Sequence, residues 1–239
     1  MKRTERRHLK DNELAVLAAN TKQLIEERRR EVTAAIVAIV VIGGAAIGWF
    51  GWRQHVQSRA YALLADAIVL NDAPVGPPRN AGVKELRFST EREKLQAALT
   101  KFKLVADQYP STDAGIFARY REASIRMALG TPDAAAKTYQ DVINHAGNSL
   151  YREMARLGLA ETQARTGQFD QAINTYKDLS QNKDALLPLD GILIQLGRAY
   201  RDAGKRAEAQ ETFNRVVQEF PDSPFTADAR KELDQLKKT

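Results

Sequence analysis

Cysteine is absent from this chain of 239 residues. Disulfide bonds, thiolate catalysis, iron–sulfur clusters and cysteine-based zinc sites are therefore excluded. Histidine is almost as scarce, because the three that occur, His8, His55 and His145, lie in three different regions of the chain. They do not form a metal cluster or a shared catalytic base, so the sequence predicts no metal site and no cofactor.

Catalytic signatures and a basic surface are lacking as well. The chain contains no phosphate-binding glycine loop, no dinucleotide-binding glycine turn, no nucleophile elbow and no zinc-protease helix. Residues 1–31 hold nine basic and six acidic side chains, and the rest of the chain holds 27 and 24, so each part carries a net charge of +3. Such a mixed surface does not favour nucleic acid. We therefore expect a protein that is not an enzyme and that binds no nucleic acid.

One long apolar run is present, from Val32 to Trp52. These 21 residues carry no charge, and a helix of that length spans roughly 30 Å, the thickness of a bilayer's hydrocarbon core. Trp49 and Trp52 stand at its end, where indole rings favour the membrane interface. A cleaved signal peptide would have a shorter charged region, a shorter apolar run and a small-residue cleavage site. The run therefore predicts an uncleaved transmembrane helix over residues 32–52.

Positive charge is distributed unevenly around this run. Nine Lys or Arg residues precede it, and two, Arg53 and Arg59, occur in the twenty residues after it. The positive-inside rule places the N-terminus in the cytoplasm and residues 53–239 on the far side of the membrane. We expect residues 1–31 to form an amphipathic helix against the anionic lipid of the inner leaflet or a binding segment for a cytosolic partner. The alternative is a partly disordered basic arm that only fixes topology.

Gly44 and Gly48 give the span a G-x-x-x-G spacing. Small residues four apart allow another helix to approach closely, so this face is a candidate for packing against a partner helix or a second copy of the chain. The alternative is the ordinary enrichment of glycine in membrane helices.

The segment after the span, residues 53–90, divides into a helix and a linker. Apolar residues at steps of three and four predict that the helix continues to about Leu70. Three prolines and two glycines within residues 71–82 then exclude a helix. We expect the linker to end near Thr90, with Ser89 or Thr90 capping the next helix.

Residues 91–239 repeat with a period of 37. Glycine recurs at 130, 167 and 204, alanine at 135, 172 and 209, and an aromatic residue at 139, 176 and 213. This pattern indicates helix–turn–helix units, in which the glycine ends the first helix and the alanine marks the closest approach of the two helices. Units of this kind stack into a solenoid, so the predicted fold is all-α.

These residues resemble the tetratricopeptide repeat. The match is fullest in residues 190–223, where Leu196, Gly197, Tyr200, Gly204, Ala209, Phe213 and Pro221 fall where that motif expects them. The units at 116–149 and 153–186 have Arg126 and Gln163 in place of the tyrosine. A polar helix over about 224–237 is expected to cap the array.

The order of anchor, exit helix and short repeat array resembles the single-pass ancillary subunit of the bacterial Sec translocon, the YfgM type. The resemblance implies a bacterial inner-membrane protein with its repeats in the periplasm. It also implies partners among translocon subunits, exported chains or periplasmic chaperones. The turns at Tyr109–Ser111 and Phe220–Pro224 also resemble scaffolds of envelope or outer-membrane assembly and cell-division coordination, which is the alternative.

In the resembled repeat, the first helix of each unit lines a concave protein-binding groove. The residues placed there are Phe117, Tyr120, Met127, Met154, Leu157, Ile194 and Arg198. Methionine and aromatic side chains adapt to varied apolar segments of a partner. Alternatively, the short array closes on itself, or on residues 57–70, and buries these side chains.

Overall fold

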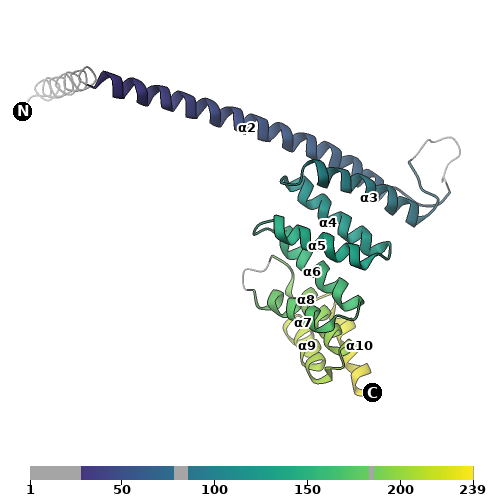
Figure 1. The fold of residues 1–239 in the computed structure, drawn as a ribbon. Coiled ribbons are helices and arrows are strands. Elements are labelled where there is room, and N and C mark those ends of the chain that lie inside the picture. Colours follow the sequence, from purple (N-terminus) through teal and green to yellow (C-terminus); the bar gives the residue numbers. More distant parts are fainter. Residues whose placement is uncertain (1–27, 78–85, 183–185, 239) are drawn as a thin grey trace, which may run out of the picture. The chain divides into compact units, whose positions relative to one another are not determined.

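The computed structural model describes residues 28–77, 86–182 and 186–238 (Figure 1). The chain divides into two compact units, with the boundary between His55 and Val56. The first unit contains the beginning of α2 (Arg29–Asp72), and the second contains the remainder of α2 and all later helices. The predicted basic arm lies almost wholly outside the described residues.

The first unit carries the apolar run on α2. Its aliphatic side chains between Ile36 and Ile47 are from 55% to 77% exposed. α2 is the one helix, within the described residues, that is long and apolar enough to cross a membrane by length and composition. At the end of the run the guanidinium of Arg53 lies 5.3 Å from the centre of the Trp49 ring. An exposed aliphatic surface of this extent is costly in water, because apolar side chains gain free energy by leaving it.

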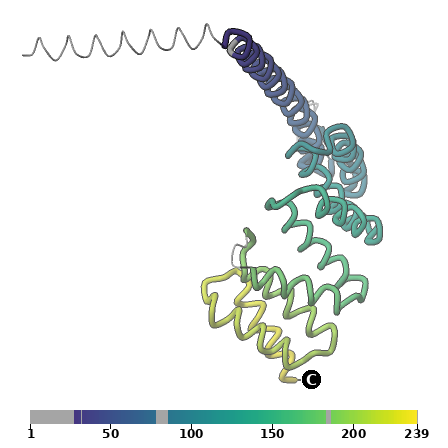
Figure 2. The backbone as a smooth tube through the Cα atoms, turned by 60° about the vertical axis from the view of Figure 1, so that its left-hand side comes forward, coloured from purple at the N-terminus to yellow at the C-terminus, as the bar shows by residue number. Residues whose placement is uncertain are grey.

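The second unit is an α-solenoid, as predicted. Its helices stack in chain order (Figures 1 and 2). After α2 they are α3 (Glu91–Gln108), α4 (Asp113–Ala128), α5 (Pro132–His145), α6 (Leu150–Arg165), α7 (Phe169–Gln181), α8 (Leu189–Asp202), α9 (Arg206–Glu219) and α10 (Thr226–Lys238). Three helix pairs, α4 with α5, α6 with α7 and α8 with α9, correspond to the three predicted units.

The turn between the two helices of each pair is built on glycine. Gly130, Gly167 and Gly204 have φ angles of 80°, 80° and 74°. Residues with a Cβ rarely adopt this left-handed conformation, so glycine is the residue that ends each first helix at low cost. The predicted role of the glycine column is confirmed.

The alanine and aromatic columns form the contacts within each pair. Ala135, Ala172 and Ala209 are fully buried. The corresponding aromatic residues, Tyr139, Tyr176 and Phe213, are at most 4% exposed. Because alanine is small, the two helices of a pair approach closely at this position. The aromatic ring fills the space next to that contact.

The repeat array includes the second half of α2. Ala60, Leu64 and Ala67 are buried in one core with Phe102 of α3 and Ala118 of α4. Gly76 donates a hydrogen bond to the carbonyl of Phe88 at 3.0 Å, so the two described ends of the linker lie together. The exit helix and α3 therefore form a fourth helix pair, and the compact unit extends back to residue 56, beyond the boundary at 91 expected from the sequence.

The predicted start of α3 agrees with the structure, whereas α10 begins later than predicted. Thr90 caps α3, because its hydroxyl accepts a hydrogen bond from the backbone N–H of Glu93. α10 begins at Thr226 and not at Pro224, because residues 221–225 form turns in which the Ser223 hydroxyl accepts from the backbone of Phe225. The buried side of α10 carries Ala229, Leu233 and Leu236, which close the last core.

Candidate functional site

The first helices of successive pairs form one layer of the solenoid. α4 contacts α6, and α6 contacts α8. The second half of α2 joins this layer, because the side-chain amide oxygen of Asn71 accepts a hydrogen bond from Arg121 of α4 at 2.9 Å. Consecutive second helices make at most marginal contact within the described residues. The first helices are thus closer together than the second helices, so they line the inner side of the array's curve.

An aromatic patch lies on this layer, near the start of the array. The rings of Phe117 on α4 and Tyr151 on α6 are 5.6 Å apart. Tyr61 on α2 is 51% exposed and lies close enough to Tyr151 to influence its ionisation. Burial and the neighbouring Tyr61 and Asp113 raise the pKa of Tyr151. We call Tyr61, Phe117 and Tyr151 the inner aromatic patch.

Arg121 borders the inner aromatic patch. Its guanidinium lies 5.6 Å from the centre of the Phe102 ring and donates to Asn71. Phe102 in turn lies 6.5 Å from Phe117, edge to face. Arginine held over an aromatic ring keeps its charge at the surface while its stem covers apolar atoms. The patch therefore combines exposed aromatic surface with a fixed cation, a composition common at protein-binding hot spots.

The side chains predicted to line the groove have different environments. Phe117, Tyr120, Met127, Met154 and Leu157 are half-buried. Tyr120 packs on Tyr139 of its own pair, with the ring centres 5.9 Å apart. These five positions retain some surface on the first helices, and their role in binding is a proposal.

The last unit differs, because Ile194 on its first helix is buried and Arg198 pairs with α10. Ile194 is fully buried in the core that includes Leu233 and Leu236 of α10. Its side chain is therefore not available to a partner in this structure. Arg198 pairs with Asp228 at 2.9 Å and Glu232 at 3.5 Å. Arg198 therefore joins α8 to the capping helix, whereas Ile194 is enclosed within the core of the array, in line with the alternative that part of the array closes on itself.

Tyr61 and Tyr151 were not among the residues that the sequence placed in the groove. The repeat motif gave no signal for Tyr61, because residues 57–70 lack the 37-residue columns. Tyr151 stands two residues before the second unit as the motif defines it, although α6 already begins at Leu150. Ser149, directly before α6, is a typical helix-capping residue. This signal could have placed the start of the helix at Leu150 and so included Tyr151.

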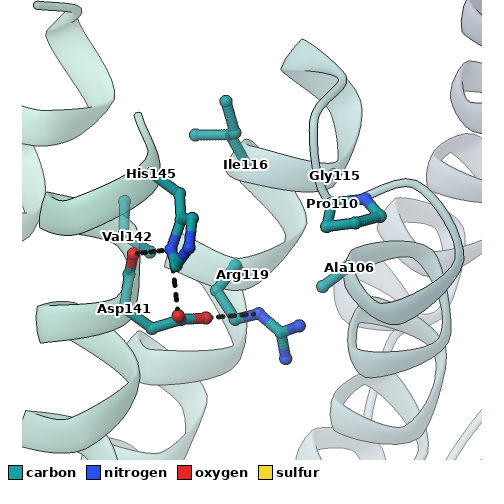
Figure 3. A pocket seen from close by; sticks show the side chains of 8 residues that line it. All are labelled: Ala106, Pro110, Gly115, Ile116, Arg119, Asp141, Val142 and His145. Atoms are coloured by element: carbon teal, nitrogen blue, oxygen red, sulfur yellow. Dashed lines mark hydrogen bonds and ion pairs between the residues drawn. The ribbon is translucent and has the colours of Figure 1, made fainter. Parts of the chain in front are cut away.

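A charged cluster occupies the joint between α3, α4 and α5 (Figure 3). Glu122 is 2% exposed and accepts hydrogen bonds from Arg119 at 2.9 Å and Arg126 at 2.7 Å. Arg119 also contacts Asp107 at 2.8 Å and Asp141 at 3.2 Å. Burial disfavours its charged form, but these carboxylates outweigh that effect, so the pKa of Arg119 lies above its ordinary value. Arg126, which replaces the motif's tyrosine, thus neutralises a buried carboxylate.

This cluster borders a pocket of about 250 Å³. Arg119, Asp141 and His145 supply its polar lining, and Ile116 and Val142 are among its apolar side chains (Figure 3). Each nitrogen of the Arg119 guanidinium already faces a carboxylate. The pocket therefore offers little to an anionic ligand, and we interpret the cluster as a structural joint. No group of three or more metal-binding side chains occurs in the part of the chain that the structure describes.

The fold and this layer of helices define a tetratricopeptide-type repeat protein, and the comparison with known families agrees. The chain belongs to the family described as the tetratricopeptide repeat-like domain, whose match covers residues 29–238. The matched region includes the apolar run on α2 as well as all later helices.

Solved structures give the same fold. The TPR-like repeats of a candidate kinesin light chain from Podosopora anserina align with a TM-score of 0.56 at 15% sequence identity, covering 76% of this chain and 87% of that one. A point variant of the same repeats aligns with a TM-score of 0.56 at 16% identity, covering 76% and 86%. At this identity the likeness concerns the fold alone. No curated protein matches the sequence.

Proposed function

We propose that this chain is a membrane-anchored scaffold that binds other proteins through the inner side of its repeat array. The inner aromatic patch is the observation that carries the proposal. Tyr61 is half exposed although it is a large aromatic residue, and it helps to raise the pKa of Tyr151, whose ring lies 5.6 Å from that of Phe117. The array does not need this exposed surface for its own packing, whereas tyrosine next to arginine is favoured where proteins bind one another.

The anchor in this proposal is the uncharged run on α2. Its exposed aliphatic side chains would be covered by lipid, and Trp49 with Arg53 would lie at the interface. The ratio of nine basic residues before the run to two after it supports a cytoplasmic N-terminus. The repeats would then lie in the periplasm of a bacterial cell. Tyr61, the first residue of the inner aromatic patch along the chain, follows Trp52 by nine residues.

The likeness of the anchor and its exit to the ancillary translocon subunit supports a narrower proposal. The chain would attend the Sec translocon and hold newly exported chains, or recruit periplasmic chaperones to them. An emerging chain is extended and exposes apolar side chains, which aromatic and methionine side chains accommodate without a fixed sequence. Scaffolding of outer-membrane or envelope assembly is the second candidate, supported by the likeness of the two proline turns.

Affinity capture from solubilised membranes tests the proposal. The full chain with Tyr61→Ala and Tyr151→Ala removes exposed aromatic surface, and the matched control carries Gln140→Ala and Lys177→Ala on exposed positions of the second helices. We expect the tyrosine variant to lose proteins that the parent and the control both retain. Translocon subunits or exported chains among the lost proteins would support the narrower proposal, and envelope-assembly proteins would favour the second candidate. Equal recovery from all three chains would contradict binding at the inner aromatic patch.

A further inference from the structure

A row of three side chains follows the inner side of α4. Asp113, Phe117 and Arg121 come one after another at steps of four residues, so they lie on one face of the helix. Phe117 belongs to the inner aromatic patch, since its ring lies 5.6 Å from that of Tyr151. Asp113 is near the same tyrosine and helps to raise its pKa. The row therefore carries a negative charge, an aromatic ring and a positive charge in order along one face, and we call it the α4 row.

Arg121 differs from the other half-buried arginines on the helices of the array. Each of the six others pairs with a carboxylate: Arg119, Arg126, Arg156, Arg198, Arg201 and Arg215. Among the described residues no carboxylate pairs with Arg121, whose guanidinium instead donates to the amide oxygen of Asn71 and lies over the Phe102 ring. The amide nitrogen of Asn71 donates to Asp72 at 2.9 Å, which fixes the orientation of this amide. Arg121 is thus a positioned cation, and a carboxylate from outside the chain is the group that a guanidinium binds most strongly.

Asp113 supplies the opposite charge at the other end of the α4 row. It is exposed, and no cation within the described part of the chain pairs with it. Its place in the first turn of α4 stabilises the N-terminus of that helix, but this role leaves the carboxylate open to solvent. The α4 row is therefore complementary in charge to a ligand with an anion next to Arg121, a cation next to Asp113 and apolar surface between them.

The spacing of the α4 row matches that of an extended segment. Four residues of an α-helix rise about 6 Å, so the three side chains of the row stand at steps of about 6 Å. In an extended segment every second side chain points to the same side, at steps of about 6.6 Å. Three alternate residues of such a segment can therefore face Arg121, Phe117 and Asp113 together.

We propose that the inner aromatic patch selects extended segments in which an acidic, an apolar and a basic residue occupy alternate positions. The acidic residue binds Arg121, the apolar residue packs on the aromatic rings, and the basic residue binds Asp113. This inference rests on the proposed function, because it names the class of segment that the patch takes. The rings supply the apolar contact, while the two charges select the segment and set its direction along α4.

Two capped peptides of equal composition test the selection on the full chain in detergent. Glu-Leu-Phe-Leu-Lys has both charges on the same side as its phenylalanine, and Leu-Glu-Phe-Lys-Leu has them on the opposite side. We expect the first to bind at least about fivefold more tightly in titration calorimetry, because only that peptide makes both charge-assisted contacts. Arg121→Gln and Asp113→Asn should each reduce this preference, and the matched control Arg230→Gln on the exposed side of α10 should retain it. Equal affinities for the parent, or a preference that Arg121→Gln leaves unchanged, would overturn the proposal.

A reversed charge on α4 gives a second measurement that loss of folding cannot imitate. Asp113→Lys should bind Glu-Leu-Phe-Leu-Glu more tightly than Glu-Leu-Phe-Leu-Lys, because both ends of the α4 row are then positive. The opposite order would contradict the assigned contact at Asp113.

The same peptides separate the charge preference from the proposed function. Tyr61→Ala with Tyr151→Ala should weaken the binding of both peptides, since both place apolar side chains on the inner aromatic patch. If the parent binds both peptides equally and this variant binds both weakly, the patch binds segments without regard to their charge, and only the charge preference is wrong. If the variant binds both peptides as tightly as the parent does, the proposed function is contradicted as well.

Discussion

Single residues in this array act mainly by being small where two helices meet. Gly197 of α8 lies directly under Phe213, and a Cβ at this position would be 2.5 Å from the ring. The equivalent positions in the other units are Ala123 and Ala160, both fully buried. In the last unit a glycine stands at this position and a phenylalanine takes the place of the tyrosine. The repeat motif expects a glycine at position 197, but the sequence did not show that the ring of Phe213 packs against it.

Gly197→Ala should destabilise the array. Overpacking of a core destabilises the folded state by about 1–3 kcal/mol. The higher helix propensity of alanine offsets about 1 kcal/mol of this cost. Gly191→Ala is the matched control on the same helix, because its Cβ would lie 3.5 Å from Phe225, an ordinary contact. Thermal unfolding of residues 56–239 should show a lower melting temperature for Gly197→Ala and an equal or higher one for Gly191→Ala, which gains helix propensity without overpacking. An equal melting temperature for the two variants would show that Phe213 can move aside.

The buried tyrosines make stability depend on alkaline pH. Burial raises the pKa of Tyr139 and of Tyr176 above that of a tyrosine in water. The unfolded chain, with a tyrosine pKa of about 10, releases these protons first. Stability is therefore complete below about pH 10 and falls as the pH rises further, by about 1.4 kcal/mol per pH unit for each such tyrosine. Tyr176→Phe should make this fall less steep in denaturant unfolding measured at pH 10 to 12. An unchanged slope would contradict the inferred burial of the hydroxyl.

Among the helices, the structure differed most from the sequence analysis at the second half of α2. The three later helix pairs could be predicted because glycine, alanine and aromatic columns recur at 37 residues. The first pair could not, since the linker between α2 and α3 breaks the register and Ala60, Leu64 and Ala67 match no column. Similarly, Ile194 is buried in a core that draws residues from α6 to α10, so its burial could not be predicted from α8 alone.

Removal of the second half of α2 should weaken the array. A fragment of residues 91–239 exposes Phe102, which is 1% exposed in the intact unit, and loses Leu64 from the same core. Burial of one such side chain contributes about 1.5–3 kcal/mol, equivalent to roughly 4–10 °C in a domain of this size. The fragment 56–239 should therefore melt at a higher temperature than the fragment 91–239. Equal melting temperatures would show that α2 only lies beside the array.

At the scale of the whole molecule, a segment suited to lipid and a repeat array occur in one chain. A helix long and apolar enough to cross a membrane could be predicted from sequence, because this property needs only length and the absence of charge. The binding surface could be predicted only in part, because exposure is decided by which helices cover one another. Phe117 was found from the motif, while Tyr61 and Tyr151 required the arrangement of α2, α4 and α6.

For the proposed anchor, we expect the uneven positive charge to set the topology. An alkaline phosphatase fused after Thr239 should be active, since that enzyme folds only where disulfides form. A fusion after Arg30 should be inactive, because the nine basic residues before the run favour a cytoplasmic location for this end. The reverse pattern of activity would overturn the assignment of the repeats to the periplasm.

The central claim is that the inner aromatic patch binds other proteins, and photocrosslinking in living cells measures this most directly. A photoreactive phenylalanine analogue at Tyr151 lies within the patch, and the same analogue at Lys177 lies on an exposed position of the second helices. The account predicts that illumination links other proteins to the chain from position 151 and few or none from position 177. Linkage that is equal from both positions, or stronger from position 177, would contradict it.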